Sequence, residues 1–538
     1  MPSTRTIASV WWIASLCLIA VASGPLACCA SKAAAVTLKL RRVSAHEVSP
    51  RVLERLAGRP HRATEWNRML IAGDNASHTT TTPHTATPRG SRSIATAQQY
   101  SGPSSTRVPL LGSVLVTGYY AIDVRLGTPP RDFQVIVDTG STMGYVPCAF
   151  CGDRCGTHTN PPFDPNGSST AQYVPCRGAT CATFCGSHGC GCQRSPDSGA
   201  GLLAPFLPRA RVCTYSRRYQ EASSSAGVLL RDAVRVGSLR QDPFTFGCET
   251  EETGAIFRQR ADGVLGLGDG PSSLMNQLHG GGTIANAFAF CIGREGGGTL
   301  VLGAEGDAMD VPPAPVASQR GGPTPAPATA SLLRHPDHPE FYTIGLRGMR
   351  IGGSLVNVSP TTYSMGYGAV LDTGTTFAYF PDPAYRAFVQ QMIAQLDLAQ
   401  NGGEGALVQV PALDPRYPDD QCFALGEGRG GEAVAAAVGP ASVSRDAEYA
   451  ELLSQFPSLS LEVEAPGGGT QSLALPPINY MFKADREDGR AGVCLGVYNN
   501  GDQGTLLGAI VFRDYLATFH LDQSRVVFEP ADCAAMEA

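Results

Sequence analysis

Two short segments of the 538-residue chain place a carboxylate in the same local setting. They read Asp138-Thr-Gly-Ser and Asp372-Thr-Gly-Thr, and each follows a run of apolar residues. A single Asp-x-Gly is ordinary turn chemistry, because Asp can bond its own backbone and Gly tolerates positive φ. Two copies behind apolar runs predict instead that Asp138 and Asp372 hold equivalent positions in two similar lobes.

Two carboxyl groups that share a small site cannot both ionise cheaply, so such a pair holds one proton across a range of acidic pH. The ionised member can take a proton from a bound water, while the protonated member donates to a carbonyl oxygen. This reaction gives a tetrahedral diol without a covalent intermediate, and it needs no metal or cofactor. We therefore expect this pair to be able to cleave an amide bond.

The segments before both Asp residues have the alternating apolar pattern of β-strands. Residues 120–126 alternate in this way, and a Gly-Thr-Pro-Pro turn leads into the apolar run 133–137 before the first Asp. The pattern returns in residues 341–346, and the short run 368–371 leads into the second Asp. The chain is thus predicted to build the same kind of unit twice.

The composition favours short strands over long helices. The chain has 62 Gly and 40 Pro and is 43% hydrophobic but only 7% aromatic, which predicts a large core, more than one domain and many turns. The fold class is therefore expected to be dominated by β-structure. The best helix follows Pro383, where one stripe holds Tyr385, Phe388, Val389, Met392 and Leu396.

Four segments of biased composition are expected to be linkers or insertions without chemistry. Residues 76–106 are rich in Thr, Ser, Pro and His, and the folded body begins after them, near Val108. Pro312–Thr329 is rich in Pro, Ala and Gly and suits an inter-lobe linker or a surface loop. Two similar stretches are Ser195–Pro208 and Gly426–Gly439.

The N-terminal residues have the order of a signal peptide. Arg5 precedes a charge-free apolar run from Ile7 to Ala22, and small residues follow as far as Ala30. An uncleaved signal anchor is the alternative, although the run is short for a membrane span. No second long apolar segment or lipid-anchor signal occurs, so we expect a soluble mature protein, with membrane attachment only if this segment is retained.

The cysteines favour an oxidising compartment. Three of the 17 lie in the leader, and the other 14, from Cys148 to Cys533, are an even number that suits disulfides. A zinc site is the alternative for the crowded stretch that begins at Cys148-x-x-Cys151, but the spacing there is uneven. Three Asn-x-Ser sequons, which suit a glycoprotein of the same compartment, begin at Asn75, Asn166 and Asn357.

The charge is unevenly distributed along the chain. Residues 31–100 hold 11 Lys and Arg against 4 Asp and Glu, whereas the whole chain has a net charge of −6. A basic segment therefore precedes an acidic body, and the opposite charges can hold the two together. The alternative is that two solvated surfaces carry opposite charge by chance.

Five further motifs accompany the two Asp-Thr-Gly loops. They are Tyr145-Val-Pro-Cys148, Phe246-Gly-Cys248, Arg260-Ala-Asp262-Gly-Val-Leu-Gly-Leu-Gly268, Cys494-Leu-Gly496 and Leu506-Leu-Gly508. Together with the loops they resemble the pepsin family, and within it the cysteine-rich plant and algal branch that includes nepenthesin-like enzymes. The resemblance covers most of residues 115–533.

The resemblance implies a bilobal pepsin-like acid protease fold with a central cleft, and an aspartic endopeptidase that acts on polypeptide substrates. The apolar-apolar-Gly segments Val264-Leu265-Gly266 and Leu506-Leu507-Gly508 would thread beneath the two catalytic loops. The disulfide pairs Cys291–Cys533 and Cys422–Cys494 are also implied.

The resemblance also assigns supporting roles around the catalytic Asp138 and Asp372. The Thr that follows each Asp would tie the two loops together, and the hydroxyl two residues later would orient the carboxylate. The supporting residues are Thr139, Gly140, Ser141, Thr373, Gly374 and Thr375.

A lid that excludes water is expected over a peptide-binding cleft. The resemblance places Tyr219 at the tip of this flap hairpin, and the alternative is a plain surface aromatic. Gln220 stands where many pepsin-like enzymes have Gly, and Tyr145 stands where animal members usually have Trp. These departures concern flap mobility and pocket shape more than the reaction.

The resemblance and the composition together divide the chain into five parts. These are a signal peptide (1–30), a basic prosegment and linker (31–107), an N-terminal catalytic lobe (108–304), an inter-lobe linker or loop (305–335) and a C-terminal catalytic lobe (336–538). We expect a monomeric zymogen of the secretory pathway, extracellular or in a vacuolar or lysosome-like compartment, whose basic prosegment covers the acidic cleft.

The strongest rival is a catalytically silent protein of the same fold that acts as a binding or inhibitor module, since fold does not fix function. The intact Asp138 and Asp372 argue against it. Other hydrolase classes fit poorly, because there is no Gly-x-Ser-x-Gly elbow and His46-Glu47-Val-Ser-Pro50 lacks the second His of a zinc-protease helix. No nucleic-acid partner is expected, because the only basic stretch lies in the expected prosegment.

Overall fold

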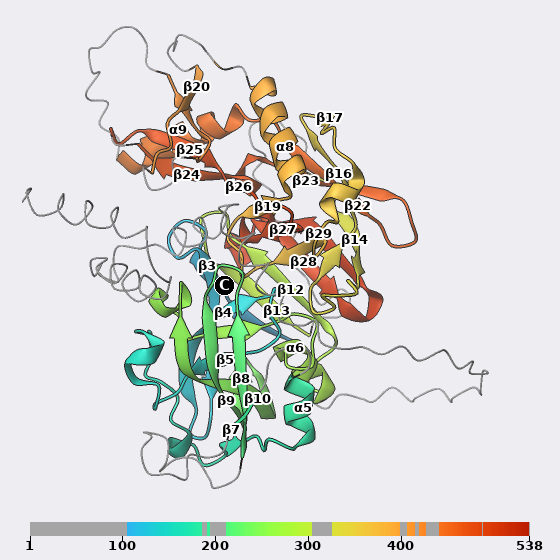
Figure 1. The fold of residues 1–538 in the computed structure, drawn as a ribbon. Coiled ribbons are helices and arrows are strands. Elements are labelled where there is room, and N and C mark those ends of the chain that lie inside the picture. The colour runs from blue at the N-terminus through green and yellow to red at the C-terminus, as the bar shows by residue number, and fades with distance from the viewer. Residues whose placement is uncertain are drawn as a thin grey trace, which may run out of the picture. The chain divides into compact units, whose positions relative to one another are not determined.

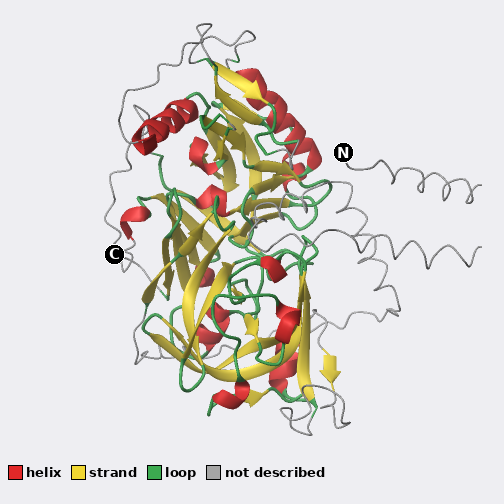
Figure 2. Ribbon diagram, turned by 90° about the vertical axis from the view of Figure 1, so that its left-hand side faces the viewer, coloured by secondary structure: helices red, strands yellow, loops and turns green. Residues whose placement is uncertain are grey.

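The computed structural model describes residues 105–185, 191–193, 211–303, 325–396, 398, 406–414, 419–426, 441–486 and 488–536. All of them belong to one compact unit. The expected signal peptide and prosegment, the stretch 195–208 and most of the stretches 312–329 and 426–439 lie outside the described residues. Strands dominate the described part of the chain, which confirms the expected fold class (Figure 2).

A ten-stranded sheet forms most of the N-terminal half (Figure 1). Its main path runs through β2 (Leu111–Ser113), β3 (Tyr119–Leu126), β4 (Arg131–Asp138), β11 (Val264–Gly266), β5 (Tyr145–Pro147), β10 (Leu239–Thr253), β9 (Ser224–Val236), β8 (Val212–Arg218) and β7 (Gly191–Gln193), and β6 (Gln172–Tyr173) pairs with β9. Strands β3 and β4 pair antiparallel, with Ala121 opposite Ile136. This is the hairpin predicted to end on Asp138.

An eleven-stranded sheet joins the two halves of the chain. Its order is β1 (Thr106–Pro109), β13 (Gly298–Leu302), β12 (Ala287–Ile292), β28 (Tyr515–His520), β29 (Arg525–Pro530), β14 (Ala328–Leu333), β15 (Thr343–Ile344), β18 (Ala369–Asp372), β27 (Thr505–Gly508), β19 (Ala378–Phe380) and β26 (Val497–Asn499). Phe288 of β12 stacks on Phe519 of β28, with ring centroids 4.6 Å apart. Strands from the expected N-terminal lobe therefore belong to a sheet that continues into the C-terminal half, and β14 occupies part of the stretch expected to be a linker.

Two four-stranded sheets complete the C-terminal half. One has the order β17 (Ser354–Leu355), β16 (Leu346–Ile351), β22 (Leu459–Glu464) and β23 (Thr470–Leu475), and the other β20 (Leu407–Val410), β21 (Cys422–Leu425), β25 (Ala491–Leu495) and β24 (Met481–Asp485).

Helices are a minority feature, and α8 is the one that the sequence predicted. The described α-helices are α5 (Ala179–Cys185), α6 (Leu274–Gly280), α7 (Pro360–Tyr363), α8 (Asp382–Gln395) and α9 (Ala441–Ser454). Helix α8 begins one residue before Pro383 and buries Ala384, Phe388 and Met392. Leu396, expected on the same stripe, is buried just beyond the helix end. None of the described helices is long and apolar enough to cross a membrane.

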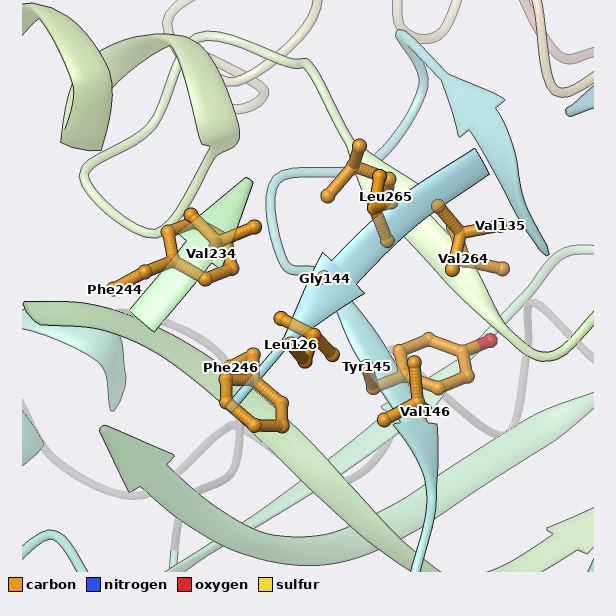
Figure 3. A pocket seen from close by; sticks show the side chains of 11 residues that line it. Leu126, Val135, Gly144, Tyr145, Val146, Val234, Phe244, Phe246, Val264 and Leu265 are labelled. Atoms are coloured by element: carbon orange, nitrogen blue, oxygen red, sulfur yellow. The ribbon is translucent and has the colours of Figure 1, made fainter. Parts of the chain in front are cut away.

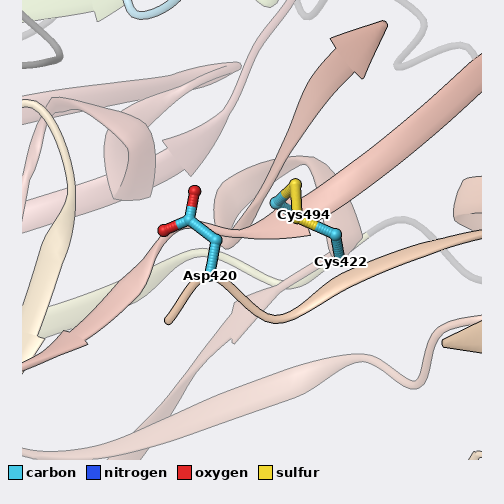
Figure 4. Close-up of side chains that lie close together, drawn as sticks. All are labelled: Asp420, Cys422 and Cys494. Carbon is cyan, nitrogen blue, oxygen red and sulfur yellow. A yellow bond between two sulfur atoms is a disulfide. The ribbon is translucent and has the colours of Figure 1, made fainter. Parts of the chain in front are cut away.

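Twelve of the described cysteines form six disulfides. The pairs are Cys148–Cys248, Cys151–Cys155, Cys176–Cys192, Cys181–Cys213, Cys291–Cys533 and Cys422–Cys494. The last two are the pairs that the family resemblance implied. Asp420 lies beside the Cys422–Cys494 bridge (Figure 4), but sulfurs bonded to each other are not thiolate ligands for a metal.

Candidate active site

Asp138 and Asp372 each end a β-strand. Each of these strands pairs in parallel with a strand whose sequence is two apolar residues followed by Gly. Asp138 of β4 pairs with Gly266 of β11, and Asp372 of β18 pairs with Gly508 of β27. A Cβ on Gly266 would collide with the backbone of Thr142 and Met143, so only Gly lets β11 pass this close to the first loop. The structure thus places both segments against the Asp loops, as the resemblance implied.

The two loops are joined through buried Thr139 and Thr373. The Thr139 amide donates to Oγ1 of Thr373 at 3.1 Å, and the Thr373 amide donates to Oγ1 of Thr139 at 2.9 Å. Each hydroxyl in turn donates to a carbonyl of the opposite strand, Thr139 to Leu371 and Thr373 to Val137, both at 2.9 Å. Each hydroxyl therefore both donates and accepts a hydrogen bond across the two loops, and these bonds hold the loops together.

The carboxylates receive the same hydrogen bonds in both loops. In each, the glycine amide two residues further on donates to Oδ1 at 2.9 Å. Ser141 donates its hydroxyl to Oδ2 of Asp138 at 2.5 Å, and Thr375 donates to Oδ2 of Asp372 at 2.6 Å. These bonds use both oxygens of each carboxylate and fix its orientation in its loop.

Burial raises the pKa of both Asp138 and Asp372. The charge of Asp372 raises the pKa of Asp138 further, while the bonds from Ser141 and Gly140 lower it. Because two carboxylates in one buried site cannot both ionise cheaply, the pair is expected to share one proton. The pair therefore has the protonation that a combined general acid and general base needs.

A hairpin of β8 and β9 brings a tight turn over the pair. The Tyr219 amide donates to the Ser223 carbonyl at 2.8 Å, and the Ala222 amide donates to the Tyr219 carbonyl at 3.1 Å. Ala222 adopts the left-handed conformation, with φ 70°. Residues 219–222 thus form a β-turn whose central residues are Gln220 and Glu221. Tyr219 is the first residue of this turn, and its role in a flap stays a prediction.

Tyr219 is held by the core of the N-terminal half. Its hydroxyl lies 2.9 Å from the hydroxyl of Tyr145, which is buried in β5. Burial and the nearby charge of Asp138 raise the pKa of Tyr219, so its hydroxyl stays protonated. Animal members usually have Trp where this chain has Tyr145. The Tyr145 hydroxyl therefore still provides a hydrogen-bond partner for Tyr219.

The flap also interacts with residues of the C-terminal half. The sequence pattern did not link these residues to the flap. Gln220 lowers the pKa of the Tyr367 hydroxyl against the effect of burial, and that hydroxyl accepts a hydrogen bond from the Asn500 side chain. Arg217 of β8 interacts with the charge of Glu340. The one signal available from the sequence was Gln220 in place of the usual Gly.

A small apolar cavity lies in the N-terminal sheet and is lined in part by Tyr145 (Figure 3). It is lined by side chains such as Val124, Val146, Val234, Phe246 and Leu265. The space open to the centre of a water molecule is about 10 Å³, which holds at most one water. The cavity therefore has neither the size nor the polar groups of a substrate site.

Comparisons with known proteins agree with this geometry. The sequence matches a family model described as xylanase inhibitor N-terminal over residues 120–304, and one described as xylanase inhibitor C-terminal over residues 341–530. It is 24% identical over 456 residues to aspartic proteinase nepenthesin-1 of Nepenthes gracilis, covering 83% of this chain and 85% of that protein. It is 25% identical over 452 residues to aspartic proteinase 39 of Arabidopsis thaliana, covering 80% and 78%.

Solved structures with a similar fold carry the names of seed proteins. Basic 7S globulin from soybean has a TM-score of 0.55 at 19% identity, covering 80% of this chain and 96% of that one. Conglutin gamma from lupine seeds has a TM-score of 0.55 at 19% identity, covering 81% and 97%. At this identity the likeness concerns the fold alone.

Proposed function

Since the chain belongs to the nepenthesin-like plant branch of the pepsin-like aspartic proteases, we propose that it is an endopeptidase that hydrolyses polypeptides with Asp138 and Asp372. This proposal rests on one observation: both carboxylates of the pair are present, with their hydrogen-bond donors in place. Each carboxylate receives the same amide and hydroxyl bonds. Nothing in this arrangement calls for a cofactor.

The reaction follows from the single shared proton. The ionised carboxylate accepts a proton from water as the water oxygen attacks the scissile carbonyl carbon, and the protonated carboxyl donates to the carbonyl oxygen. The resulting diol collapses when the carboxyl that took the water proton gives it to the amide nitrogen, a diol hydroxyl returns its proton to the other carboxylate, and the C–N bond breaks. The bonds between Thr139 and Thr373 keep the carboxylates at the separation that this exchange requires.

A catalytically silent binding or inhibitor module is the second candidate. One observation favours it: the matching family models are described as xylanase inhibitor. The intact pair favours the enzyme, because a binding module has no use for a shared proton between buried carboxylates.

We further propose that the enzyme is made as a secreted zymogen. The six disulfides of the described residues suit an oxidising compartment, as do the three sequons. The basic segment 31–107 would act as the prosegment, and the mature protein would be an extracellular or vacuolar monomer.

The test is digestion of a peptide library by the purified protein at a series of pH values from about 3 to 7, on both sides of the ordinary carboxyl pKa. Cleavage that is strongest in acid and blocked by a transition-state analogue of aspartic peptidases would support the proposal. Asp138→Asn protein prepared in parallel controls for contaminating peptidases. Cleavage that survives this substitution, or none by the wild-type protein after removal of its N-terminal segment, would leave the binding module as the better account.

A further inference from the structure

The loop between β14 and β15 carries a histidine, His338, and a glutamate, Glu340. The carbonyl of Glu340 accepts a hydrogen bond from the Asp269 amide of the N-terminal half at 2.8 Å. Two residues later, the Tyr342 hydroxyl donates to the Leu267 carbonyl at 2.7 Å. The backbone at Glu340 is therefore fixed against the N-terminal half.

Aromatic contacts and a carboxylate surround the His338 ring. The ring stacks on Phe341, with centroids 5.4 Å apart, and meets the Tyr367 ring edge to face at 6.4 Å. Its Nδ1 lies 3.7 Å from Oε1 of Glu340. The His338 side chain is 42% exposed and can exchange protons with solvent, whereas that of Glu340 is only 16% exposed. A proton on His338 therefore places a cation beside a carboxylate that solvent screens little.

The flap lies beside the same tyrosine. Burial raises the pKa of the Tyr367 hydroxyl, and Asn500 and Gln220 oppose that effect. Gln220 is an exposed central residue of the turn over the catalytic pair. The tip of the flap and the His338 ring thus both border Tyr367.

Arg217 of the flap is half-buried near the end of β8 and gains from a nearby anion. Burial lowers its pKa, and the charges that oppose this shift belong to Tyr219, Glu340, Tyr215 and Tyr145. Burial raises the pKa of all three tyrosines, so they stay neutral. Of these four groups, Glu340 is therefore the one whose negative charge acts on Arg217 between acid and neutral pH.

Glu340 thus faces two cations with different pH dependence. Arg217 keeps its charge throughout this range, whereas His338 is charged only when it is protonated. Protonation of His338 divides the attraction of one carboxylate between two partners, and it weakens the hold of Glu340 on the flap.

Other titratable groups face the same place, and none of them replaces His338. They are Arg334, His335 and Asp337 of the same loop, Tyr367, and Asp269 beyond Glu340. Arg334 and Asp337 are exposed, so solvent screens their charges. His335 accepts a hydrogen bond from the Asp337 amide at Nδ1, so a proton on that nitrogen would cost this bond.

We propose that Glu340 is a positioning residue that holds the flap closed through Arg217 near neutral pH, and that protonation of His338 releases the flap in acid. This inference rests on the proposed function. It adds a second, histidine-controlled step to the acid dependence of the carboxylate pair, so the cleft would open to substrate in the pH range where that pair can act.

The experiment measures hydrogen exchange of the flap amides in Asp138→Asn protein, at about pH 5 and pH 7.5, on either side of the range where histidines titrate. The rates are corrected for the intrinsic pH dependence of exchange. The amides of Tyr219 and Ala222 report on the turn, because their hydrogen bonds close it. Three variants are compared in this background: His338→Gln stays neutral, His338→Lys stays charged, and His335→Gln is the matched control.

Protection of the flap amides should fall about three- to fivefold from the higher to the lower pH, the size of one partly exposed ion pair. His338→Lys should show the lower protection already at pH 7.5, and His338→Gln should keep the higher protection at pH 5. His335→Gln should behave like the parent protein. Adding Glu340→Gln should remove the difference between the two His338 variants, because they act through its carboxylate.

In active enzyme, His338→Lys should lower KM about threefold at pH 7 and leave kcat at pH 4 unchanged, because it affects entry of substrate and not the reaction. A loss of protection in acid that is the same in His338→Gln and in the parent protein would overturn the inference, even if peptides are cleaved. The exchange measurement needs no peptidase activity. Release of the flap by His338 in a chain that cleaves no peptide would instead count against the proposed endopeptidase and leave the role of Glu340 standing.

Discussion

Gly140 of the first catalytic loop packs directly against Asp372 of the second. A Cβ on Gly140 would lie 2.6 Å from Oδ1 of Asp372, closer than side chains tolerate. Gly374 stands in the same relation to Asp138. Each loop therefore needs its glycine for the other loop's carboxylate as well as for its own turn.

Gly140→Ala should consequently separate the two carboxylates and lower kcat by about a hundredfold or more, since small displacements of reacting groups have effects of that size. Gly280→Ala is the matched control, because a Cβ there meets nothing within 4 Å. The melting temperature and kcat of both variants would be measured. A normal kcat in the Gly140→Ala enzyme would contradict the close contact between the loops.

Because the hydroxyls of Tyr219 and Tyr145 hydrogen-bond each other, substitutions of these two residues should have coupled effects on kcat/KM. Tyr219→Phe and Tyr145→Phe each remove the same bond, so each should lower kcat/KM roughly fivefold, the size of one hydrogen bond of about 1 kcal/mol. The double variant should be little worse than either single one. Asp138→Asn and Asp372→Asn should instead abolish turnover. Additive losses in the two Tyr variants would show that the hydroxyls act separately.

The local features of this site could be predicted from the sequence because they depend on short-range patterns. The strand alternation before Asp138, the helix after Pro383 and the repeated Asp-Thr-Gly turns are all contained within a few residues. The pairing of β12 with β28 could not be predicted from local periodicity, because the two strands are more than 200 residues apart and periodicity does not specify a partner.

The burial of charged residues in the N-terminal half could not be predicted from the sequence. Glu249-Thr-Glu-Glu252 has the composition of a solvated acidic run, yet the structure buries its first and last members. Regular alternation would place Glu249 and Glu251 on the same face, and the register shift of β10 between these two residues turns Glu251 outward instead. Similarly, the turn that carries Glu221 depends on the left-handed Ala222, a conformation that is unusual for a residue with a Cβ.

The burial of Glu249 and Glu252 predicts that the fold is most stable in acid. Burial raises the pKa of both carboxyls, and the charge of Glu249 raises that of Glu252 further. Among the described residues neither pairs with Lys or Arg, although His158 lies 3.6 Å from Glu252. A carboxyl whose pKa is higher in the folded state contributes stability that is complete below its unfolded pKa and is lost as pH rises toward its folded pKa.

The melting temperature should therefore fall as pH rises from about 4.5, the ordinary carboxyl range, through neutrality. Replacing both residues by Gln should flatten this decline, whereas Glu251→Gln should leave it unchanged. The measurement is best made in Asp138→Asn protein, because autolysis would otherwise lower the apparent stability. A decline of the same slope after both replacements would assign the pH dependence to other groups.

The basic segment before the folded body predicts activation by acid. Carboxylates that pair with Lys or Arg have lowered pKa values, so the attraction between the segment and the acidic body should persist near pH 7 and fade as acid protonates those carboxylates. Release would expose the pair Asp138 and Asp372 in its working protonation range. Trp11, Trp12 and Trp66 report on this step, because they are the only tryptophans of the chain and all precede the body.

Cleavage in the stretch near residues 90–110 should leave a mature enzyme without tryptophan. The secreted precursor would be moved to about pH 4, near the ordinary carboxyl pKa, and freed of small fragments while tryptophan emission, mass and peptidase activity are followed. Activity should appear as tryptophan leaves the large fragment. The Asp138→Asn precursor is the control, and it should mature slowly or only when active enzyme is added. Full activity at neutral pH in a species that still contains Trp66 would show that the segment does not inhibit, while leaving the assignment of the carboxylate pair intact.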